Sequence, residues 1–152
     1  MKAVIIYTSV TGNTEMLAKM IHSNLSRLFE HVEIFEIKEF SMGKMEEYSV
    51  IVIGTYTWGN GAIPKEMLEL YTAIEQLDTK HITTGVFGTG DTFYPHYCGA
   101  VDKFRDMLFV HTNLAVTLKV ELLPQTQENQ KCEKFAEIMF ERSKLVGQFP
   151  NV

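Results

Sequence analysis

Short runs of apolar residues alternate along this chain with longer segments in which apolar residues recur every three or four positions. The short runs predict buried strands, and the longer segments predict amphipathic helices. The expected strands are residues 3–7, 32–37, 50–53, 82–87 and 114–120. The expected helices are residues 13–28, 64–77, 99–109 and 128–145.

This alternation predicts an α/β fold, in which a five-stranded parallel sheet carries helices on both faces. The strand at residues 50–53 is the most hydrophobic and is expected at the centre, whereas the alternating pattern of residues 32–37 is typical of a strand near an edge. Ligands of such sheets bind beyond the carboxyl ends of the strands, where the winding direction reverses. Chemistry is therefore expected just after the first, third and fourth strands.

The apolar residues at helical spacing are expected to face the sheet. In the first helix they are Met16, Leu17, Met20, Ile21, Leu25 and Leu28. In the second they are Met67, Leu68, Tyr71, Ile74 and Leu77, and in the third Val101, Phe104 and Leu108.

Residues 9–14, between the first strand and the first helix, read SVTGNT. A helix amino terminus offers unpaired N–H groups and a partial positive charge, which together hold an anion. Gly12 lets the backbone approach closely, and side-chain donors are available from Ser9, Thr11, Asn13 and Thr14. An ordinary helix cap by Thr11 or Asn13 is the alternative, but one polar residue suffices for a cap. The segment matches neither the triphosphate nor the dinucleotide glycine motif, so we expect a different anion held by neutral donors.

Residues 54–63, GTYTWGNGAI, follow the central strand and contain the only tryptophan, Trp58. A core tryptophan that closes the end of the sheet is the structural alternative. However, Gly59, Asn60 and Gly61 all adopt positive φ at low cost. A turn centred on residues 59–60 can therefore rotate its central peptide, which a purely structural turn does not need.

Residues 87–99, FGTGDTFYPHYCG, form a long connection for this architecture. Tyr94 alone would be interpreted as an exposed turn residue, but opposite Trp58 it can form the second wall of an aromatic slot. Asp91 is the only acid of this segment, and His96 and Cys98 add titratable side chains. None of the three segments contains Lys or Arg.

Length and composition restrict the possible classes of protein. A chain of 152 residues, 45% of them hydrophobic, predicts one globular domain over residues 1–152. A net charge of -5 argues against nucleic acid and anionic membranes as partners. Cys98 and Cys132 form no metal-binding or redox motif, and no segment has the pattern of a signal peptide or membrane span. We therefore expect a cytoplasmic protein with two free thiols and no metal.

The chain resembles the flavodoxins of the short-chain type, most of all those of Gram-positive, Bacillus-like bacteria. The resemblance covers nearly the whole chain and is carried by SVTGNT at residues 9–14, TWG at 57–59, GTGD at 88–91, Tyr94 and CGA at 98–100. Residues 120–123 continue without the extra loop of the long-chain forms. The resemblance implies a three-layer flavodoxin-like fold with the sheet order 2-1-3-4-5, for which flavodoxin is the type example.

The resemblance also implies a low-potential one-electron carrier, not an enzyme, which shuttles non-covalently bound FMN between semiquinone and hydroquinone. The FMN phosphate would lie in residues 9–14, and the ring between Trp58 and Tyr94. The carbonyl of Gly59 would rotate to accept a hydrogen bond from the ring on reduction. The implied FMN-binding residues are Ser9, Val10, Thr11, Gly12, Asn13, Thr14, Thr57, Trp58, Gly59, Asn60, Thr89, Gly90, Asp91, Tyr94 and Cys98. Asn60 departs from the family, because many relatives carry Asp there, and so one negative charge near the ring is missing.

The implied partners are a flavodoxin or ferredoxin reductase-type donor and basic-surfaced acceptor proteins, with the chain acting as a monomer. Two FMN alternatives are a flavodoxin-like NAD(P)H:quinone or flavin reductase and the FMN protein that activates ribonucleotide reductase. The first needs an open ring face that Tyr94 would cover, and proteins of the second kind are shorter. A signalling receiver domain needs acids after the first and third strands, where this chain has Thr8-Ser9 and Gly54-Thr55.

Overall fold

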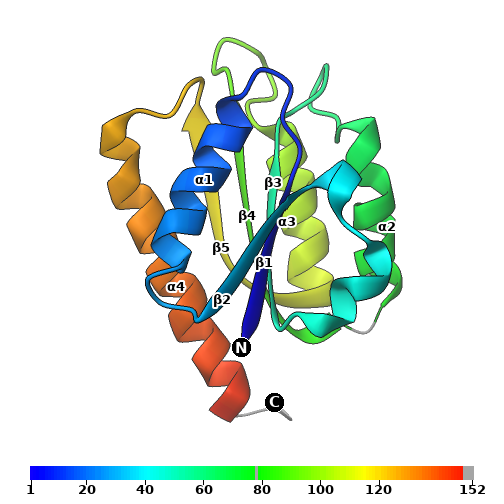
Figure 1. Cartoon of the computed structure of the whole chain (residues 1–152). Coiled ribbons are helices and arrows are strands. Elements are labelled where there is room, and N and C mark those ends of the chain that lie inside the picture. Colours follow the sequence, from blue (N-terminus) through cyan, green and yellow to red (C-terminus); the bar gives the residue numbers. More distant parts are fainter. Residues whose placement is uncertain (78, 149–152) are drawn as a thin grey trace.

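The computed structural model describes residues 1–77 and 79–148, in which one parallel sheet lies between two layers of helices (Figure 1). In spatial order the strands are β2 (His31–Glu36), β1 (Lys2–Tyr7), β3 (Val50–Thr55), β4 (Thr79–Gly90) and β5 (Thr112–Glu121). The helices are α1 (Asn13–Leu25), α2 (Leu68–Gln76), α3 (Gly99–His111) and α4 (Asn129–Gln148). The expected order 2-1-3-4-5 is confirmed.

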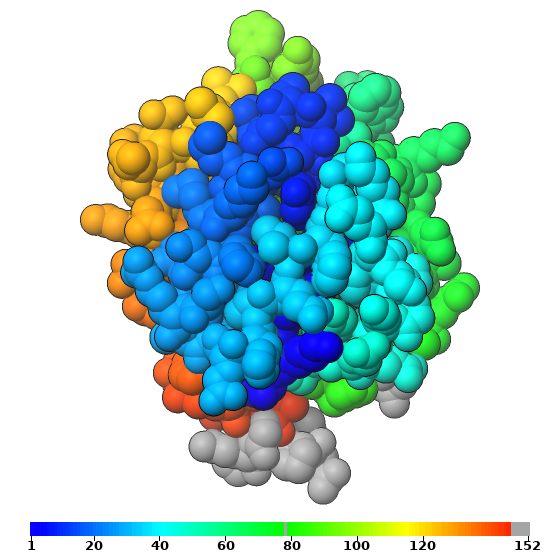
Figure 2. All heavy atoms as spheres, viewed as in Figure 1, coloured from blue at the N-terminus to red at the C-terminus, as the bar shows by residue number. Residues whose placement is uncertain are grey.

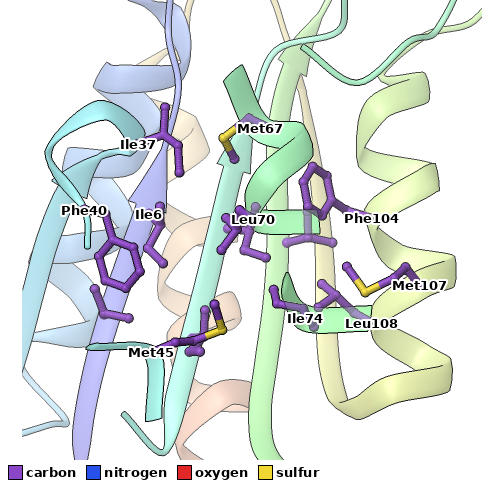
Figure 3. Close-up of a cluster of buried hydrophobic side chains, with 14 of the residues drawn as sticks. Ile6, Ile37, Phe40, Met45, Met67, Leu70, Ile74, Phe104, Met107 and Leu108 are labelled. Atoms are coloured by element: carbon purple, nitrogen blue, oxygen red, sulfur yellow. The ribbon is translucent and has the colours of Figure 1, made fainter. Parts of the chain in front are cut away.

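Each face of the sheet has its own hydrophobic core. On one face, side chains of β1, β3 and β4 pack against α2, α3 and the segment after β2; Figure 3 labels Ile6, Ile37, Phe40, Met45, Met67, Leu70, Ile74, Phe104, Met107 and Leu108. On the other face, Leu17 and Ile21 of α1 and Phe135 and Met139 of α4 cover the sheet. Because every residue of β3 is buried, its continuous apolar pattern is explained by its central position.

All four helices differ from the expected ranges at one or both ends, and at α1 and α2 the difference changes which side chains are buried. Helix α1 ends at Leu25, three residues before the predicted end, so Leu28 lies outside the helix and is 37% exposed. Met16, expected to face the sheet, is 43% exposed. Before α2, residues Lys65–Met67 form a 3-10 turn, which changes the direction of the following side chains. Leu68 is consequently exposed, and Leu70 is buried in its place.

Strand β4 is longer than predicted and includes Gly88, Thr89 and Gly90, which the sequence had placed in a loop. These residues continue the parallel ladder with β5, with Gly90 opposite Glu121. A Cβ at Gly88 would lie 2.2 Å from Val101 Cγ2 and 2.5 Å from the carbonyl oxygen of Thr55. Gly88 therefore marks close packing of α3 on the sheet and not a turn. The connection to α3 is correspondingly shorter, over residues 91–98.

The segments that follow β1, β3 and β4 lie together at the carboxyl edge of the sheet, at the top of the view (Figure 1). In the space-filling view the β4–α3 segment projects beyond the rest of this edge (Figure 2). The expectation that the three polar segments meet at one edge is confirmed, and the reason is the common direction of the parallel strands.

Candidate functional site

A cavity of about 420 Å³ lies at this edge, and all three segments contribute to its wall. The first segment contributes Val10, Thr11, Asn13 and Thr14, and the second contributes Tyr56, Thr57 and Gly59. From the strand end and loop of the third come Thr89, Gly90, Asp91, Tyr94, His96 and Cys98. Among the described residues of this wall, none is Lys or Arg.

Ser9 caps the amino terminus of α1 from inside the loop. Its Oγ accepts hydrogen bonds from the N–H groups of Gly12 and Glu15, each at 3.2 Å. The N-cap position is Gly12, which has no side chain, and Ser9 supplies the oxygen that a cap residue would supply; the alternative of a cap by Thr11 or Asn13 is wrong. Ser9 Oγ donates no hydrogen bond among the described residues, so its own proton remains available for donation.

Apart from the N–H of Ser9 itself, four N–H groups in this segment have no partner among the described residues. They belong to Val10, Thr11, Asn13 and Thr14, all of which line the cavity. Gly12 stands between them at φ 95°, in the left-handed region. These unpaired amides, together with the partial positive charge of the helix end, make an anion site without any cationic side chain.

Thr14 ties the start of α1 to the end of β4. Its Oγ1 lies 2.7 Å from Oγ1 of Thr89, and both residues are buried. Two hydroxyl groups joined by one hydrogen bond retain one free proton between them. This pair therefore offers one side-chain donor and not two.

Trp58 lies in a tight turn and is not a core residue. Its N–H donates to the carbonyl of Ala62 at 2.9 Å, and the N–H of Ala62 donates back to the Trp58 carbonyl at 2.7 Å. Between them Gly59 and Gly61 have positive φ, 51° and 91°, whereas Asn60 does not. The indole is 63% exposed, which overturns the alternative of a core tryptophan. Trp58, Asn60, Ser9 and Gly12 are the predicted site residues that do not themselves line the cavity.

Tyr94 lines the cavity from the opposite loop and is also 63% exposed. Its ring packs edge to face against Phe93, with 6.1 Å between ring centroids. The loop is held by Asp91, whose Oδ1 accepts a hydrogen bond from the N–H of Phe93 at 2.9 Å. Thr57 links the second and third segments, because its Oγ1 accepts a hydrogen bond from the N–H of Ala100 at 3.1 Å.

Cys98 is a buried residue of the cavity wall. Burial raises the pKa of its thiol to about 11, so the thiol is neutral at physiological pH. A neutral, buried thiol is a poor nucleophile, and Cys98 therefore contributes to the wall by shape. No group of three His, Cys, Asp or Glu side chains in the described part of the chain is arranged to hold a metal ion.

Three residues of the cavity wall were missed by the sequence reasoning: Tyr56, His96 and Leu122. Tyr56 and His96 lie inside the quoted segments, so their positions alone could have suggested them. Leu122 has no sequence signal. It adopts φ 53° where the chain leaves β5, and its N–H donates to the Gly90 carbonyl at 2.7 Å.

Behind the cavity, Glu66 accepts two hydroxyl hydrogen bonds on one carboxylate oxygen. Thr8 Oγ1 donates at 2.7 Å and the Tyr56 hydroxyl at 2.8 Å. Partial burial raises the pKa of the Glu66 carboxyl, but hydrogen bonds from its own N–H, Thr8 and Tyr56 outweigh this and lower it below the ordinary value. Burial and the bond to Glu66 raise the pKa of Tyr56 to about 12.

Comparison with known proteins shows one consistent likeness. Residues 5–136 match the model of the Flavodoxin family. Probable flavodoxin 1 of Bacillus subtilis strain 168 is 37% identical over 139 residues, which cover 89% of this chain and 87% of the relative. Oxidised flavodoxin 1 of Bacillus cereus matches with a TM-score of 0.84 at 34% identity, over 93% of this chain and 98% of that one. A flavodoxin of Streptococcus pneumonia TIGR4 gives 0.85 at 33% identity, over 93% and 99% of the two chains. Across the described residues, no helix is both long and apolar enough to cross a membrane.

Proposed function

The chain belongs to the flavodoxin family, and from this premise we propose that residues 1–152 form a single domain with FMN in the cavity at the carboxyl edge of the sheet. Flavodoxins are electron-transfer proteins and not enzymes, so the protein is an FMN-binding electron carrier. When bound, FMN supplies the one-electron chemistry, and the protein holds it and adjusts its potentials.

The observation that carries this proposal is the set of unpaired N–H groups beside the cavity. The amides of Val10, Thr11, Asn13 and Thr14 have no partner among the described residues. A phosphate dianion at a helix amino terminus uses donors of this kind. The residues present therefore fit the phosphate of FMN, and we assign that group to the first segment.

We assign the two faces of the flavin ring to Trp58 and Tyr94. Tyr94 lines the cavity, and Trp58 lies between Thr57 and Gly59, which also line it. Both aromatic side chains are exposed and thus available for stacking on a planar ligand. The Gly59 carbonyl accepts no hydrogen bond from the described residues, so it is free to hold a ring N–H. Backbone groups of Thr89–Asp91 and Cys98 are assigned to the ring edge.

The electrostatics of the site favour low potentials. The three segments contain no Lys or Arg, and the chain carries a net charge of -5. An electron added to the bound group increases negative charge where no cation compensates it, which disfavours reduction. Asn60 adds no negative charge to the Trp58 turn, and this limits the effect.

We further propose a reductase-type electron donor, basic-surfaced acceptor proteins, a monomeric state and a location in the cytoplasm. The negative net charge supports basic partners, because opposite charges accelerate encounter. Both cysteines are buried and free, which suits a reducing compartment.

Purified protein, freed of its flavin, tests the function by titration with FMN and then by stepwise anaerobic reduction. We expect two separable one-electron steps in the visible spectrum. Because Trp58 is the only tryptophan, its fluorescence should be strongly quenched on FMN addition. Reduction in one two-electron step with rapid NAD(P)H turnover would instead identify a reductase, and unchanged fluorescence would remove Trp58 from the site.

A further inference from the structure

Glu66 connects the two segments that are assigned to opposite ends of FMN. It lies in the Lys65–Met67 turn that leads into α2. Its carboxylate oxygen Oε2 accepts hydrogen bonds from Thr8, at 2.7 Å, and from Tyr56, at 2.8 Å. Thr8 is the residue directly before the phosphate segment 9–14, and Tyr56 directly precedes Thr57 and Trp58.

The position of this carboxylate matters because, in the described part of the chain, no hydrogen bond joins the two segments directly beyond the end of the β1–β3 pairing. Strands β1 and β3 are paired as far as Tyr7 and Gly54, and the Thr8 N–H donates to the Gly54 carbonyl at 3.0 Å. Beyond that point, no hydrogen bond among the described residues joins residues 9–14 to residues 57–63. The two hydrogen bonds to Glu66 are therefore the last polar connection between these two segments before they separate around the cavity.

The tie is suited to holding its partners in place. Thr8 is 2% exposed, so its hydroxyl has little access to water as an alternative partner. Tyr56 lines the cavity, so the position of its ring affects the cavity directly. Hydrogen bonds to an ionised acceptor are stronger than those between neutral groups.

We propose that Glu66 is a positioning residue that sets the spacing between the phosphate segment and the Trp58 turn, so that one FMN molecule engages both. The proposal rests on the assignment of FMN to this cavity. Glu66 does not line the cavity itself and acts through Thr8 and Tyr56.

This role has a specific thermodynamic consequence. When the ring is bound, the phosphate meets its own site at an effective concentration that depends on how well the two sites are spaced. Loss of the tie lowers that effective concentration without removing a donor from the phosphate site. FMN, which spans both sites, must therefore lose more affinity than riboflavin, which lacks the phosphate, or inorganic phosphate, which lacks the ring.

The test uses the flavin-free full-length protein with Glu66→Ala, Glu66→Gln and the control Glu69→Ala. Glu69 lies in the first turn of α2, is exposed, and has no hydrogen bond or ion pair among the described residues. Glu69→Ala thus makes the same change in charge three residues further along the chain, in α2. For each protein the affinities for FMN, riboflavin and inorganic phosphate are measured by calorimetry or fluorescence, together with thermal unfolding.

Glu66→Ala removes both hydrogen bonds, and we expect the ratio of FMN to riboflavin affinity to fall roughly tenfold, because the effective concentration of the phosphate at its own site is lowered. Phosphate affinity should stay as in wild type, and Glu66→Gln, which retains an acceptor oxygen, should recover part of the ratio. In the Glu66→Ala background, Thr8→Val should cause no further fall, because the bond is already absent.

A ratio in Glu66→Ala equal to that in Glu69→Ala would overturn the proposal, and so would a change limited to thermal unfolding. A parallel loss of phosphate affinity would overturn it as well, because Glu66 would then act on the phosphate site alone. Wild-type protein that binds no FMN would instead contradict the proposed function, so the two failures are distinguishable.

Discussion

Ser9 and Thr11 carry the same kind of hydroxyl two positions apart, yet the structure gives them different surroundings. Ser9 Oγ accepts two backbone N–H groups and holds the loop in shape. The Thr11 hydroxyl donates and accepts no hydrogen bond among the described residues, and Thr11 lines the cavity. A side chain that shapes a loop and one that contacts a ligand can have the same chemistry, and their partners distinguish them.

Thr11→Ala should therefore weaken FMN binding with little effect on riboflavin, because only FMN carries the phosphate dianion. The loss of one charge-assisted hydrogen bond predicts a cost of about 1.5–3 kcal/mol. Titration of both ligands into flavin-free protein measures the difference, with riboflavin as the internal control. Equal losses for the two ligands would place the phosphate elsewhere.

Gly59 is a second position at which one residue decides the behaviour of the site. Its φ is 51°, and a Cβ there would meet no atom within 4 Å, so a side chain would cost only backbone strain. From the sequence, low-cost positive φ at residues 59–61 is expected to let the central peptide rotate. In the structure, the turn already has positive φ.

In Gly59→Thr the free turn should relax away from positive φ, and restoring that φ in the complex should weaken the binding of oxidised FMN by about 1–3 kcal/mol. Asn60→Thr is the matched control, because Asn60 does not have positive φ. Equilibrium titration of both variants with oxidised FMN measures the effect, and only Gly59→Thr should lose affinity. If Gly59→Thr binds oxidised FMN as wild type does, the bound turn has a different conformation from the one seen here.

At the scale of elements, the end of β4 links the sheet to the cavity. The strand continues through Gly88, Thr89 and Gly90, and thereby brings Thr89 to Thr14 and Gly90 to Leu122. This extension depends on close packing, because Gly88 lies against Val101 of α3. The end of a paired strand, and not a loop, therefore supplies Thr89 and Gly90 to the cavity wall.

Gly88→Ala should destabilise the protein, since its Cβ would lie 2.2 Å from Val101 Cγ2 and 2.5 Å from a backbone oxygen. Overpacking of this kind costs about 1–3 kcal/mol, and the backbone contact points to the upper part of that range. Gly43→Ala is the control, because the nearest atom to its Cβ would be Ser41 Oγ at 4.0 Å. Urea unfolding of the two variants should separate them; equal midpoints would mean that α3 shifts freely on the sheet.

At the scale of the whole molecule, charge and shape determine how the protein meets its partners. The net charge is -5, and the aromatic side chains of Trp58, Phe93 and Tyr94 are exposed at the carboxyl edge. The site therefore lies on an outer edge of a molecule that carries a net negative charge.

Electron transfer to a basic protein acceptor should become slower as salt concentration rises, because screening weakens the attraction between opposite charges. Stopped-flow rates measured between about 10 mM and 200 mM salt test this, since the Debye length falls from about 30 Å to less than 10 Å over that range. A small uncharged oxidant serves as the control and should show little change. A rate to the basic protein that does not depend on salt would argue against electrostatic steering.

The sequence alone determined the fold class, the central position of residues 50–53 and the three segments at the ligand edge. These features depend on local periodicity and on the common direction of parallel strands, both of which can be recognised without coordinates. The family resemblance supplied the strand order, which the structure confirms.

Tertiary structure alone decided the partners of individual side chains. Ser9 caps α1, Thr14 pairs with Thr89, and Glu66 joins Thr8 to Tyr56, although 58 positions in the chain separate Thr8 from Glu66. Tertiary structure also decided that Gly88 belongs to a strand. Its glycine is required by the close approach of Val101 from α3, and no local sequence pattern shows how that helix packs. Periodicity reports which face of an element is buried, but contacts between distant segments depend on how the elements pack, and that depends on the whole chain at once.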